Sequence, residues 1–496
     1  PFPLLGHNRN YAYGLTMFEN DDINLFQEEN NPENPNQYKY KNEFKNYTVR
    51  KKTIKVKDSS DIVLNIKESI HGPIMNDVMN TISSEKPIAM SWIYTQEKNQ
   101  ILDAVYHLSH SKNVDDFRKS IELVHAPGLN IMYGDAKNNI SWTASGKLYK
   151  LDKSINPNFI LNGSNGIDDQ KEFLPFDKNP SALNPNWNYL YSANNQTEAI
   201  DGYLYPGYYL PKDRAERIDN LLLPKNNWTK TDVKKMIVDN TSSRSSFVVS
   251  TILPNIELKN KSKNFETAYG ILSKWDGSNN ENDIAPTIYN KFIYHYLKNT
   301  FEDELGKKDF EALLATHIVK QIIEPQIANE NSIWWDDIST KDKKENRATI
   351  LTKSLEEAIV SLENQLGKDV NSWTWNKVHK LEHVHPIGQV KLLRSFFNVG
   401  KFDIAGSNEV INNLAFIYTD NQEHLVKAGP STRRIIDFSD VENSVSILPT
   451  GNSGNPMSKY YNNQAEMYNK GQFRKMKMNK KEILETSTKL VFKPKK

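Results

Sequence analysis

The chain of 496 residues contains no cysteine. This absence excludes disulfide bonds, zinc sites built on thiolates and a cysteine nucleophile. The sequence also lacks any run of about 18 apolar residues, the length that a membrane-spanning helix needs. Neither a signal sequence nor an initiator methionine stands at the start. We therefore expect a mature processed product or a fragment of a longer gene product, with no membrane as a partner.

An excess of either charge is also missing. Lysine and arginine together number 63, and aspartate and glutamate number 61, which gives a formal net charge of +2. Such a balance gives no reason to expect nucleic acid as a partner. Nine Trp, 23 Tyr and 20 Phe are nevertheless present, and they supply large side chains for a core.

The first 150 residues show the alternation of apolar and polar positions that is typical of strands. Residues 45–70 alternate on both sides of Asp58–Ser60, which predicts a hairpin with its turn at those residues. A second hairpin is predicted over Met132–Trp142, and Ile88–Ile93 is typical of a buried strand. The apolar spacing over 114–124 predicts a helix.

Helical spacing dominates the middle of the chain, and strands return after Pro386. The predicted helices are 213–224, 230–240, 264–275, 284–304, 308–323 and 341–366. The predicted return strands are Phe402–Ile404, Leu414–Thr419, Ser431–Asp437 and Val445–Leu448.

This pattern predicts one α+β body with a mainly helical insertion in the middle. Residues 1–212 are expected to form the first part of the core, with a long irregular region over 151–212. Residues 213–385 are expected to form the mainly helical region. Residues 386–496 are expected to supply the return strands and to close the core.

Short motifs are spread over the chain from residue 6 to about residue 475. They are Gly6–Asn8, the run from Ala12 to Phe26, Ser69–Pro73, Tyr133–Asp135 with Asn139–Ile140, Leu174–Phe176, Asn184–Pro185, Ala193–Asn195, Trp275–Gly277, His385–Gly388, Gly429–Arg433 and Gly451–Pro456. In this order they resemble the β chain of the penicillin acylase (penicillin amidase) family.

The resemblance implies an Ntn-hydrolase αββα sandwich, in which two stacked antiparallel sheets lie between layers of helices. Such enzymes arise from a zymogen by autocatalytic processing, and the free α-amino group of an N-terminal serine activates its own hydroxyl. Here that serine is expected upstream of Pro1, because proline has no side-chain nucleophile. The expected partners are a missing α chain and the missing N-terminal part of the β chain.

The resemblance also implies three catalytic-site residues. The main-chain N–H of Met17 and the side-chain amide of Asn194 are expected to bind the oxyanion, and Arg214 is expected to line the site. Each has an alternative interpretation that stays open. In the alternative interpretations, Met17 would be only a core residue and Asn194 only a turn residue with left-handed backbone. Arg214 would be only a solvated charge at a helix end.

A structural Ca²⁺ is the cofactor that the resemblance implies. The expected ligands are Asp21, the carbonyl of Ile23, Asn24 and Asp201. Calcium takes six or more oxygen ligands, and Asn24 stands where a carboxylate is often found, which lowers the charge. The alternative is a capped polar loop without metal.

A cluster of histidines invites a different metal hypothesis. His379 and His383 are four residues apart, with Glu382 and His385 close by. Pro386 follows at once and the order is not that of a zinc protease helix, so we interpret this segment as structural.

The resemblance implies an amide hydrolase that acts on small-molecule linear N-acyl amides through an acyl-enzyme. Acylated β-lactams, N-acyl-homoserine lactones and other N-acyl amines are the candidate substrates, which suggests a role in antibiotic metabolism. A catalytically silent fragment or a non-enzymatic binding relative is the alternative. A periplasmic or secreted location is expected from the resemblance.

Overall fold

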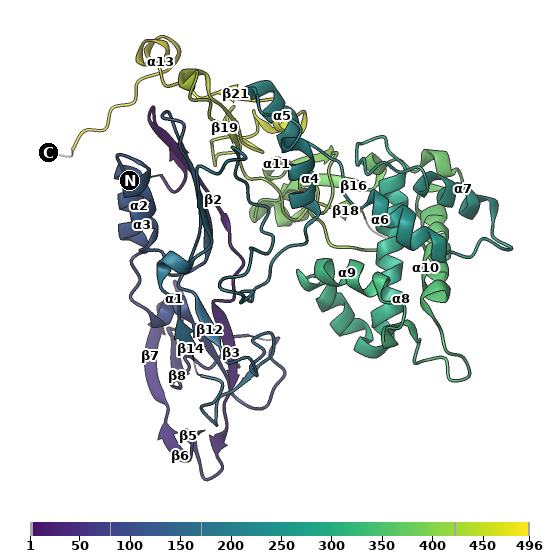
Figure 1. Cartoon of the computed structure of the whole chain (residues 1–496), viewed down its shortest axis with the longest axis horizontal. Coiled ribbons are helices and arrows are strands. Elements are labelled where there is room, and N and C mark those ends of the chain that lie inside the picture. Colours follow the sequence, from purple (N-terminus) through teal and green to yellow (C-terminus); the bar gives the residue numbers. More distant parts are fainter. Residues whose placement is uncertain (1–2, 80, 170, 421–422, 495–496) are drawn as a thin grey trace. The chain divides into compact units, whose positions relative to one another are not determined.

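A computed structural model describes residues 3–79, 81–169, 171–420 and 423–494 (Figure 1). The chain forms two compact units, Pro1–Leu210 and Pro211–Lys496. The first unit is built mainly from strands, and helices dominate the first half of the second unit. The predicted boundary at residue 385 lies inside the second unit and stays a prediction.

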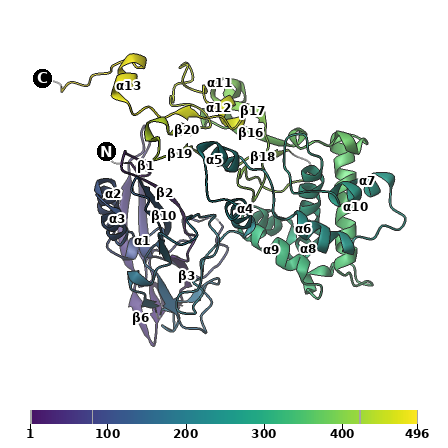
Figure 2. The same cartoon turned by 45° about the horizontal axis from the view of Figure 1, so that its top comes forward.

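The first unit is organised around a five-stranded antiparallel sheet. Its order is β1 (Gly6–His7), β2 (Tyr11–Met17), β10 (Leu129–Asp135), β11 (Ile140–Ser145) and β15 (Ser181–Leu183). Helices α2 (Ile101–His110) and α3 (Val114–Ile121) pack together beside it (Figures 1 and 2). Alternate residues of β2 face these helices, so that Tyr11 and Tyr13 are buried with Phe117 and Tyr133.

The strand that follows β2 in the chain belongs to a second sheet, which has three strands. Strand β3 (Ile23–Gln27) pairs with β9 (Ile88–Trp92) on one side and β13 (Leu161–Asn162) on the other. The remaining strands of this unit are β4 (Asn30–Asn31), β5 (Asn34–Tyr40), β6 (Glu43–Asn46), β7 (Thr48–Ile54), β8 (Ile62–Glu68), β12 (Tyr149–Leu151) and β14 (Lys171–Phe173). The hairpins predicted over 45–70 and 132–142 are thus confirmed as β7–β8 and β10–β11.

The Ser69–Pro73 motif forms a turn around a buried carboxylate. The Ser69 hydroxyl donates to Glu28 Oε1 at 2.5 Å, and His71 Nδ1 lies 2.8 Å from the same oxygen. Glu28 is fully buried, and the His71 ring stacks on Phe26. Gly72 has a φ of +139°, and a Cβ there would lie 2.1 Å from the Met90 carbonyl oxygen. Only glycine therefore fits this turn without a shift of the backbone.

Long helices carry the core of the second unit. Helix α8 (Ala285–Leu314) and helix α10 (Arg347–Leu366) lie side by side (Figures 1 and 2), with α7 (Lys263–Leu272) packed on both. The other helices of this unit are α4 (Asp213–Leu222), α5 (Lys230–Ile237), α6 (Ser245–Phe247), α9 (Ile318–Ala328), α11 (Arg394–Phe397), α12 (Ala465–Asn469) and α13 (Lys480–Thr486), and the short α1 (Ile93–Gln96) belongs to the first unit. The break predicted between the helices 284–304 and 308–323 is confirmed, because the non-helical backbone of Gly306 kinks α8 there. The second predicted helix is itself interrupted, since α8 ends at Leu314 and α9 begins at Ile318.

Three of the four predicted return strands are present but short: β17 (Val399–Asp403), β19 (Arg433–Ile435) and β20 (Val445–Ile447). This unit also contains strands at β16 (His379–His383), β18 (His424–Leu425) and β21 (Arg474–Lys475). The strand predicted over Leu414–Thr419 is wrong. Its apolar residues are buried in alternation, but only Ala415 pairs with another extended segment, in an isolated bridge to Ala428. At Phe416 the side chain of Asn408 hydrogen-bonds both main-chain groups instead.

Of the histidine cluster after α10, His379 is part of the core, whereas His383 and His385 are only partly buried. His379 is fully buried, and its ring nitrogens lie 2.9 Å from the Ile404 carbonyl oxygen and 3.2 Å from that of Leu414. Burial lowers the pKa of His379 to about 4. These contacts give His379 a structural role. Among the described helices of both units, none is long and apolar enough to cross a membrane.

Candidate functional site

Met17 lies at the end of β2, where the ladder with β10 stops. The amide of Phe18 donates to the Gly128 carbonyl at 3.1 Å, and Met17 is the register partner of Leu129. Bonded and non-bonded pairs alternate along an antiparallel ladder, so Met17 and Leu129 form a non-bonded pair. The N–H and C=O of Met17 therefore point away from β10. Met17 is 45% exposed in this chain and is not one of its described core residues.

Asn194 lies against Met17 although it is 177 positions away. Its side-chain amide donates to the Met17 carbonyl oxygen at 2.8 Å. The main-chain carbonyl of Asn194 accepts from the Leu210 amide at 2.9 Å. The N–H and C=O of a strand residue face the same side, so Asn194 lies on the edge to which the Met17 N–H points. The backbone of Asn194 is left-handed, with a φ of +61°, which asparagine tolerates. Both residues thus meet, and their catalytic role stays a prediction.

Two further contacts hold this edge in place. The side-chain amide of Asn130 also donates to the Met17 carbonyl, at 3.0 Å, and its oxygen accepts from Trp142 Nε1 at 2.9 Å. The hydroxyls of Thr16 and Ser192 lie 2.7 Å apart. The Met17 carbonyl therefore accepts from two side chains, and the segment that leads to Asn194 is tied to β2.

A cavity of about 580 Å³ lies beside these contacts in the first unit. Asn130, Trp142 and Ser192 line it, and Trp187, Tyr189, Leu190 and Tyr191 supply aromatic and apolar surface. Asp177, Lys178, Glu198 and Asp201 supply charge. Sequence reasoning missed this cavity, although the aromatic stretch 187–191 inside the irregular region is a usable signal.

Arg214 belongs to the second unit. It lies near the start of α4, where its Nε is 3.6 Å from Glu409 Oε2. Lys320 donates to the other oxygen of Glu409 at 2.5 Å. Arg214 is mostly buried in this charge cluster, so it is not a solvated charge at a helix end. Its predicted role in lining the catalytic site stays a prediction.

Of the residues expected to bind calcium, Asp21 and Asn24 are in contact with each other. Asn24 donates to Asp21 Oδ2 at 3.0 Å, and its own oxygen accepts from the Tyr149 hydroxyl at 2.8 Å. Asp21, Asn24 and Tyr149 are all buried. Ile23 begins β3 and is paired with Trp92. Burial raises the pKa of Asp21 to about 6, and the hydrogen bond from Asn24 opposes that rise.

Asp201, the fourth expected ligand, forms an ion pair elsewhere. Its Oδ2 lies 3.1 Å from Lys178 Nζ, and its side chain is 60% exposed. Across the described part of the chain, no group of three or more His, Asp or Glu side chains is arranged to hold a metal ion. The donor set therefore fits a six-oxygen calcium site poorly, and calcium binding itself stays an untested prediction.

With the fold and these contacts described, comparisons with known proteins identify the family. The family model of penicillin amidase matches residues 1–485. The chain belongs to the penicillin amidase family. A solved structure of the thermostable penicillin G acylase from Alcaligenes faecalis has a similar fold, with a TM-score of 0.71 at 15% identity over 100% of this chain and 90% of that chain. The mixed α+β class is thereby confirmed.

Curated relatives carry acylase names. An acyl-homoserine lactone acylase QuiP of Pseudomonas syringae pv. syringae is 26% identical over 95% of this chain and 59% of its own length. The QuiP of Pseudomonas aeruginosa is 24% identical over 95% of this chain and 60% of its own length. Penicillin G acylase of Escherichia coli is 26% identical over 60% of this chain and 36% of its own length. The chain thus spans about three fifths of the length of the first two relatives.

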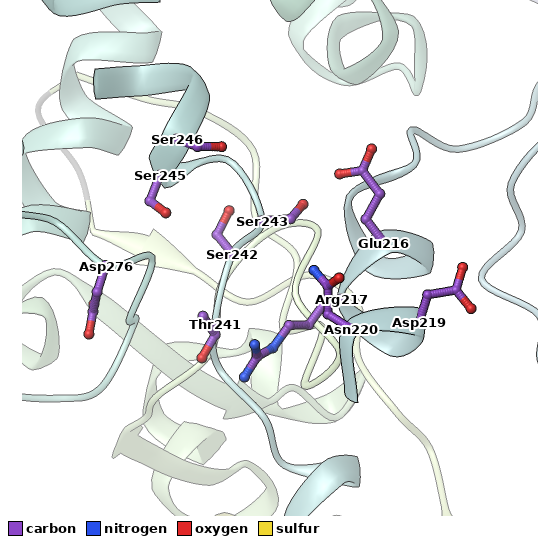
Figure 3. Close-up of a pocket in the computed structure, with 10 residues that line it drawn as sticks. All are labelled: Glu216, Arg217, Asp219, Asn220, Thr241, Ser242, Ser243, Ser245, Ser246 and Asp276. Atoms are coloured by element: carbon purple, nitrogen blue, oxygen red, sulfur yellow. The ribbon is translucent and has the colours of Figure 1, made fainter. Parts of the chain in front are cut away.

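A second cavity, of about 500 Å³, lies in the second unit of this chain (Figure 3). It is lined by Glu216, Arg217, Asp219, Asn220, Thr241, Ser242, Ser243, Ser245, Ser246 and Asp276. Side chains of α4 lie on one side of it and a serine-rich segment on the other. Arg217 is held by Asp239 through bonds of 2.9 and 2.6 Å. A serine nucleophile is usually activated by a histidine or lysine that acts as general base. None of the residues that line this cavity is a histidine or a lysine.

Proposed function

We propose that the protein containing this chain hydrolyses linear N-acyl amides. Membership of the penicillin amidase family and the acylase names of the relatives support an amide substrate. The observation that carries the proposal is the contact between Asn194 and the Met17 carbonyl. It puts a side-chain amide and a main-chain N–H on one edge of the sheet, an arrangement suited to binding a developing oxyanion.

The reaction begins on a serine hydroxyl at a processed N-terminus, supplied upstream of Pro1. The serine oxygen attacks the substrate carbonyl while the α-amino group accepts the hydroxyl proton. The negative charge that develops on the carbonyl oxygen is stabilised by the Met17 N–H and by one N–H of Asn194. The other N–H of Asn194 keeps its bond to the Met17 carbonyl, so the amide does not reorient during the reaction.

The tetrahedral intermediate then collapses and the C–N bond breaks. The α-amino group returns the proton to the leaving amine and leaves an ester on the serine. Water attacks the ester while the α-amino group accepts its proton, and a second oxyanion forms at the same two donors. When this intermediate collapses, the C–O bond to the serine breaks, the serine oxygen takes the proton back from the α-amino group, and the carboxylic acid leaves. Arg214 is proposed to line this site. Its buried charge is balanced by Glu409.

The cavity beside Asn130 and Trp142 is proposed to receive the part of the substrate that does not react. Its aromatic wall suits an acyl chain, and its volume of about 580 Å³ is in the range of small-molecule sites. N-acyl-homoserine lactones and acylated β-lactams are the proposed substrate classes, in line with the names of the relatives.

The whole protein is proposed to be a processed enzyme with a separate α chain and two stacked antiparallel sheets between helices. The five-stranded antiparallel sheet of the first unit and the name "proenzyme" of a Pseudomonas penicillin acylase relative support this proposal. A periplasmic or secreted location is proposed with it.

The proposal is tested with the full natural protein and two substrate series. One series varies the acyl chain on a constant amine, and the other varies the amine on a constant acyl chain. Release of acid and amine, measured by mass spectrometry, and dependence of kcat/KM on the acyl chain are expected. A protein that binds these amides but releases no amine over hours would instead be a catalytically silent relative.

The role of the cavity is tested separately with Trp142→Ala. This variant removes part of the aromatic wall and enlarges the cavity. The acyl chain with the highest kcat/KM is therefore expected to be longer than for the natural protein. The preference for the amine is expected to stay constant. A change in amine preference with an unaltered acyl preference would assign the cavity to the leaving group.

A further inference from the structure

Asn130 of β10 lies opposite Thr16 and is hydrogen-bonded on both sides of Met17. Phe18 and Gly128 form a bonded pair in the ladder of β2 and β10. Bonded and non-bonded pairs alternate, so Thr16 and Asn130, two positions away, also exchange main-chain hydrogen bonds. This exchange fixes the peptide group that carries the Met17 N–H. The side-chain amide of Asn130 donates to the Met17 carbonyl at 3.0 Å and so fixes the peptide group that follows.

Only one orientation of the Asn130 side-chain amide satisfies its partners. Its oxygen accepts from Trp142 Nε1 at 2.9 Å, and its nitrogen donates to the Met17 carbonyl. An indole N–H can only donate and a carbonyl can only accept, so turning the amide by 180° would break both bonds. Asn130 is 3% exposed, and an unmade hydrogen bond at a buried group is costly. The indole N–H therefore determines which way the amide faces.

Trp142 connects this amide to the cavity of about 580 Å³. It lies on β11 and lines the cavity together with Asn130. Asn130 is opposite Ala144, and Trp142 is two residues from Ala144, so both side chains lie on one face of the sheet. The other face, where Ile131 and Tyr133 are buried, packs against α2 and α3. The indole is thus part of the cavity wall and a hydrogen-bond donor to Asn130 at the same time.

We propose that Asn130 is a positioning residue for the Met17 N–H, and that the indole N–H of Trp142 acts on it through Asn130. The proposal rests on the proposed function, in which the Met17 N–H binds the oxyanion. A donor stabilises a developing charge best when it is held in place before the charge forms. Asn130 holds the peptide groups on both sides of Met17, so the cavity wall and the proposed donor form one hydrogen-bonded unit.

The first test measures kcat and KM of the full natural protein and of Asn130→Ala on one N-acyl amide. The variant removes the side-chain bonds of Asn130 and keeps its main-chain bonds to Thr16. Removal of an oxyanion donor costs about 100-fold or more in kcat, and a residue that only positions the donor should cost less. We expect kcat to fall about 10-fold and KM to stay within a few-fold.

The outcomes of this test separate the two proposals. A folded Asn130→Ala variant with natural kcat would overturn the role of Asn130, whether or not its KM is changed. In that case the activity of the natural protein would leave the proposed function standing. A natural protein that hydrolyses no amide would overturn the proposed function, and the role of Asn130 with it.

The second test is a double-mutant cycle with Trp142→Phe. This substitution keeps an aromatic ring in the cavity wall and removes the indole N–H. We expect kcat to fall a few-fold in the natural protein and not to fall further in Asn130→Ala, because the N–H has no partner there. Equal losses in both backgrounds would overturn the proposal. If Asn130→Ala does not fold, Trp142→Phe alone decides, since natural kcat in that variant would also overturn it.

Asn179 offers a matched control. It is similarly buried, at 5% exposure, and its side-chain amide donates to the main-chain carbonyls of Ala144 and Gly146 at 2.9 Å each. Asn179→Ala therefore removes a buried amide from main-chain carbonyls but leaves Met17 untouched. We expect a lower Tm with natural kcat and KM. A loss of kcat as large as that of Asn130→Ala would show that lost stability lowers the rate, and would overturn the positioning role.

Discussion

The side-chain amide of Asn194 donates a 2.8 Å hydrogen bond to the main-chain carbonyl of Met17. That one bond determines which way the amide faces. The carbonyl and N–H of Met17 leave the strand on the same side, so the Asn194 amide lies on the edge to which the Met17 N–H points. The proposed function assigns these two groups as the oxyanion donors, and several of the predictions below test that proposal.

The substitution Met17→Ala tests whether the main chain or the side chain of residue 17 matters. The main-chain N–H survives this change, and the side chain is 45% exposed. We expect kcat to stay within a few-fold of the natural value and the Tm to be unaltered, while KM changes for substrates that contact the side chain. Steady-state kinetics on the full natural protein measure both. A loss of about 100-fold in kcat would assign the catalytic role to the side chain instead.

Gly72→Ala tests the turn in the Ser69–Pro73 motif. The new Cβ would lie 2.1 Å from the Met90 carbonyl oxygen, at a φ of +139°. We expect a loss of stability of more than about 1 kcal/mol, measured by urea denaturation. Gly202→Ala is the matched control, because Gly202 has a φ of +76° but no atom within 4 Å of a new Cβ. Equal losses in the two variants would show that backbone conformation alone, without the clash, sets the cost.

Asp213→Asn tests a buried carboxylate at the start of α4. Burial raises the pKa of Asp213 to about 6, and Arg244, 3.2 Å away, opposes this rise. The folded chain therefore holds a proton between about pH 4 and pH 6 that the unfolded chain has released, so the contribution of Asp213 to stability falls as pH rises through that window. The variant removes this dependence.

The measurement is the free energy of unfolding of both proteins at several pH values. The natural protein is expected to lose on the order of 2 kcal/mol relative to the variant between pH 4 and pH 7. Asp232→Asn should show the opposite sign, because Lys225 and Thr229 hold the pKa of Asp232 well below its usual range. A difference between natural protein and Asp213→Asn that does not vary with pH would contradict the assignment.

Local patterns predicted the local elements of this fold well. Alternation around Asp58–Ser60 predicted the β7–β8 hairpin, and apolar spacing predicted α3 and α10. The helix α2 was missed, although Ile101, Ala104 and Leu108 have helical spacing. The segment over Leu414–Thr419 has strand alternation without a strand, because a side chain takes the hydrogen bonds of the expected neighbour.

The candidate site depends on contacts that no local pattern contains. Motif order singled out Asn194, but its bond to Met17 follows from tertiary structure.

The most direct test of the account is kcat/KM of the full natural protein and of its Asn194→Gly variant on an N-acyl amide. Glycine keeps the left-handed backbone and removes only the amide, and Asn188→Gly, at a φ of +64°, makes the same change away from Met17. We predict a loss of about 100-fold or more for Asn194→Gly, mainly in kcat, and natural activity for Asn188→Gly. Full activity of a folded Asn194→Gly variant would contradict the account.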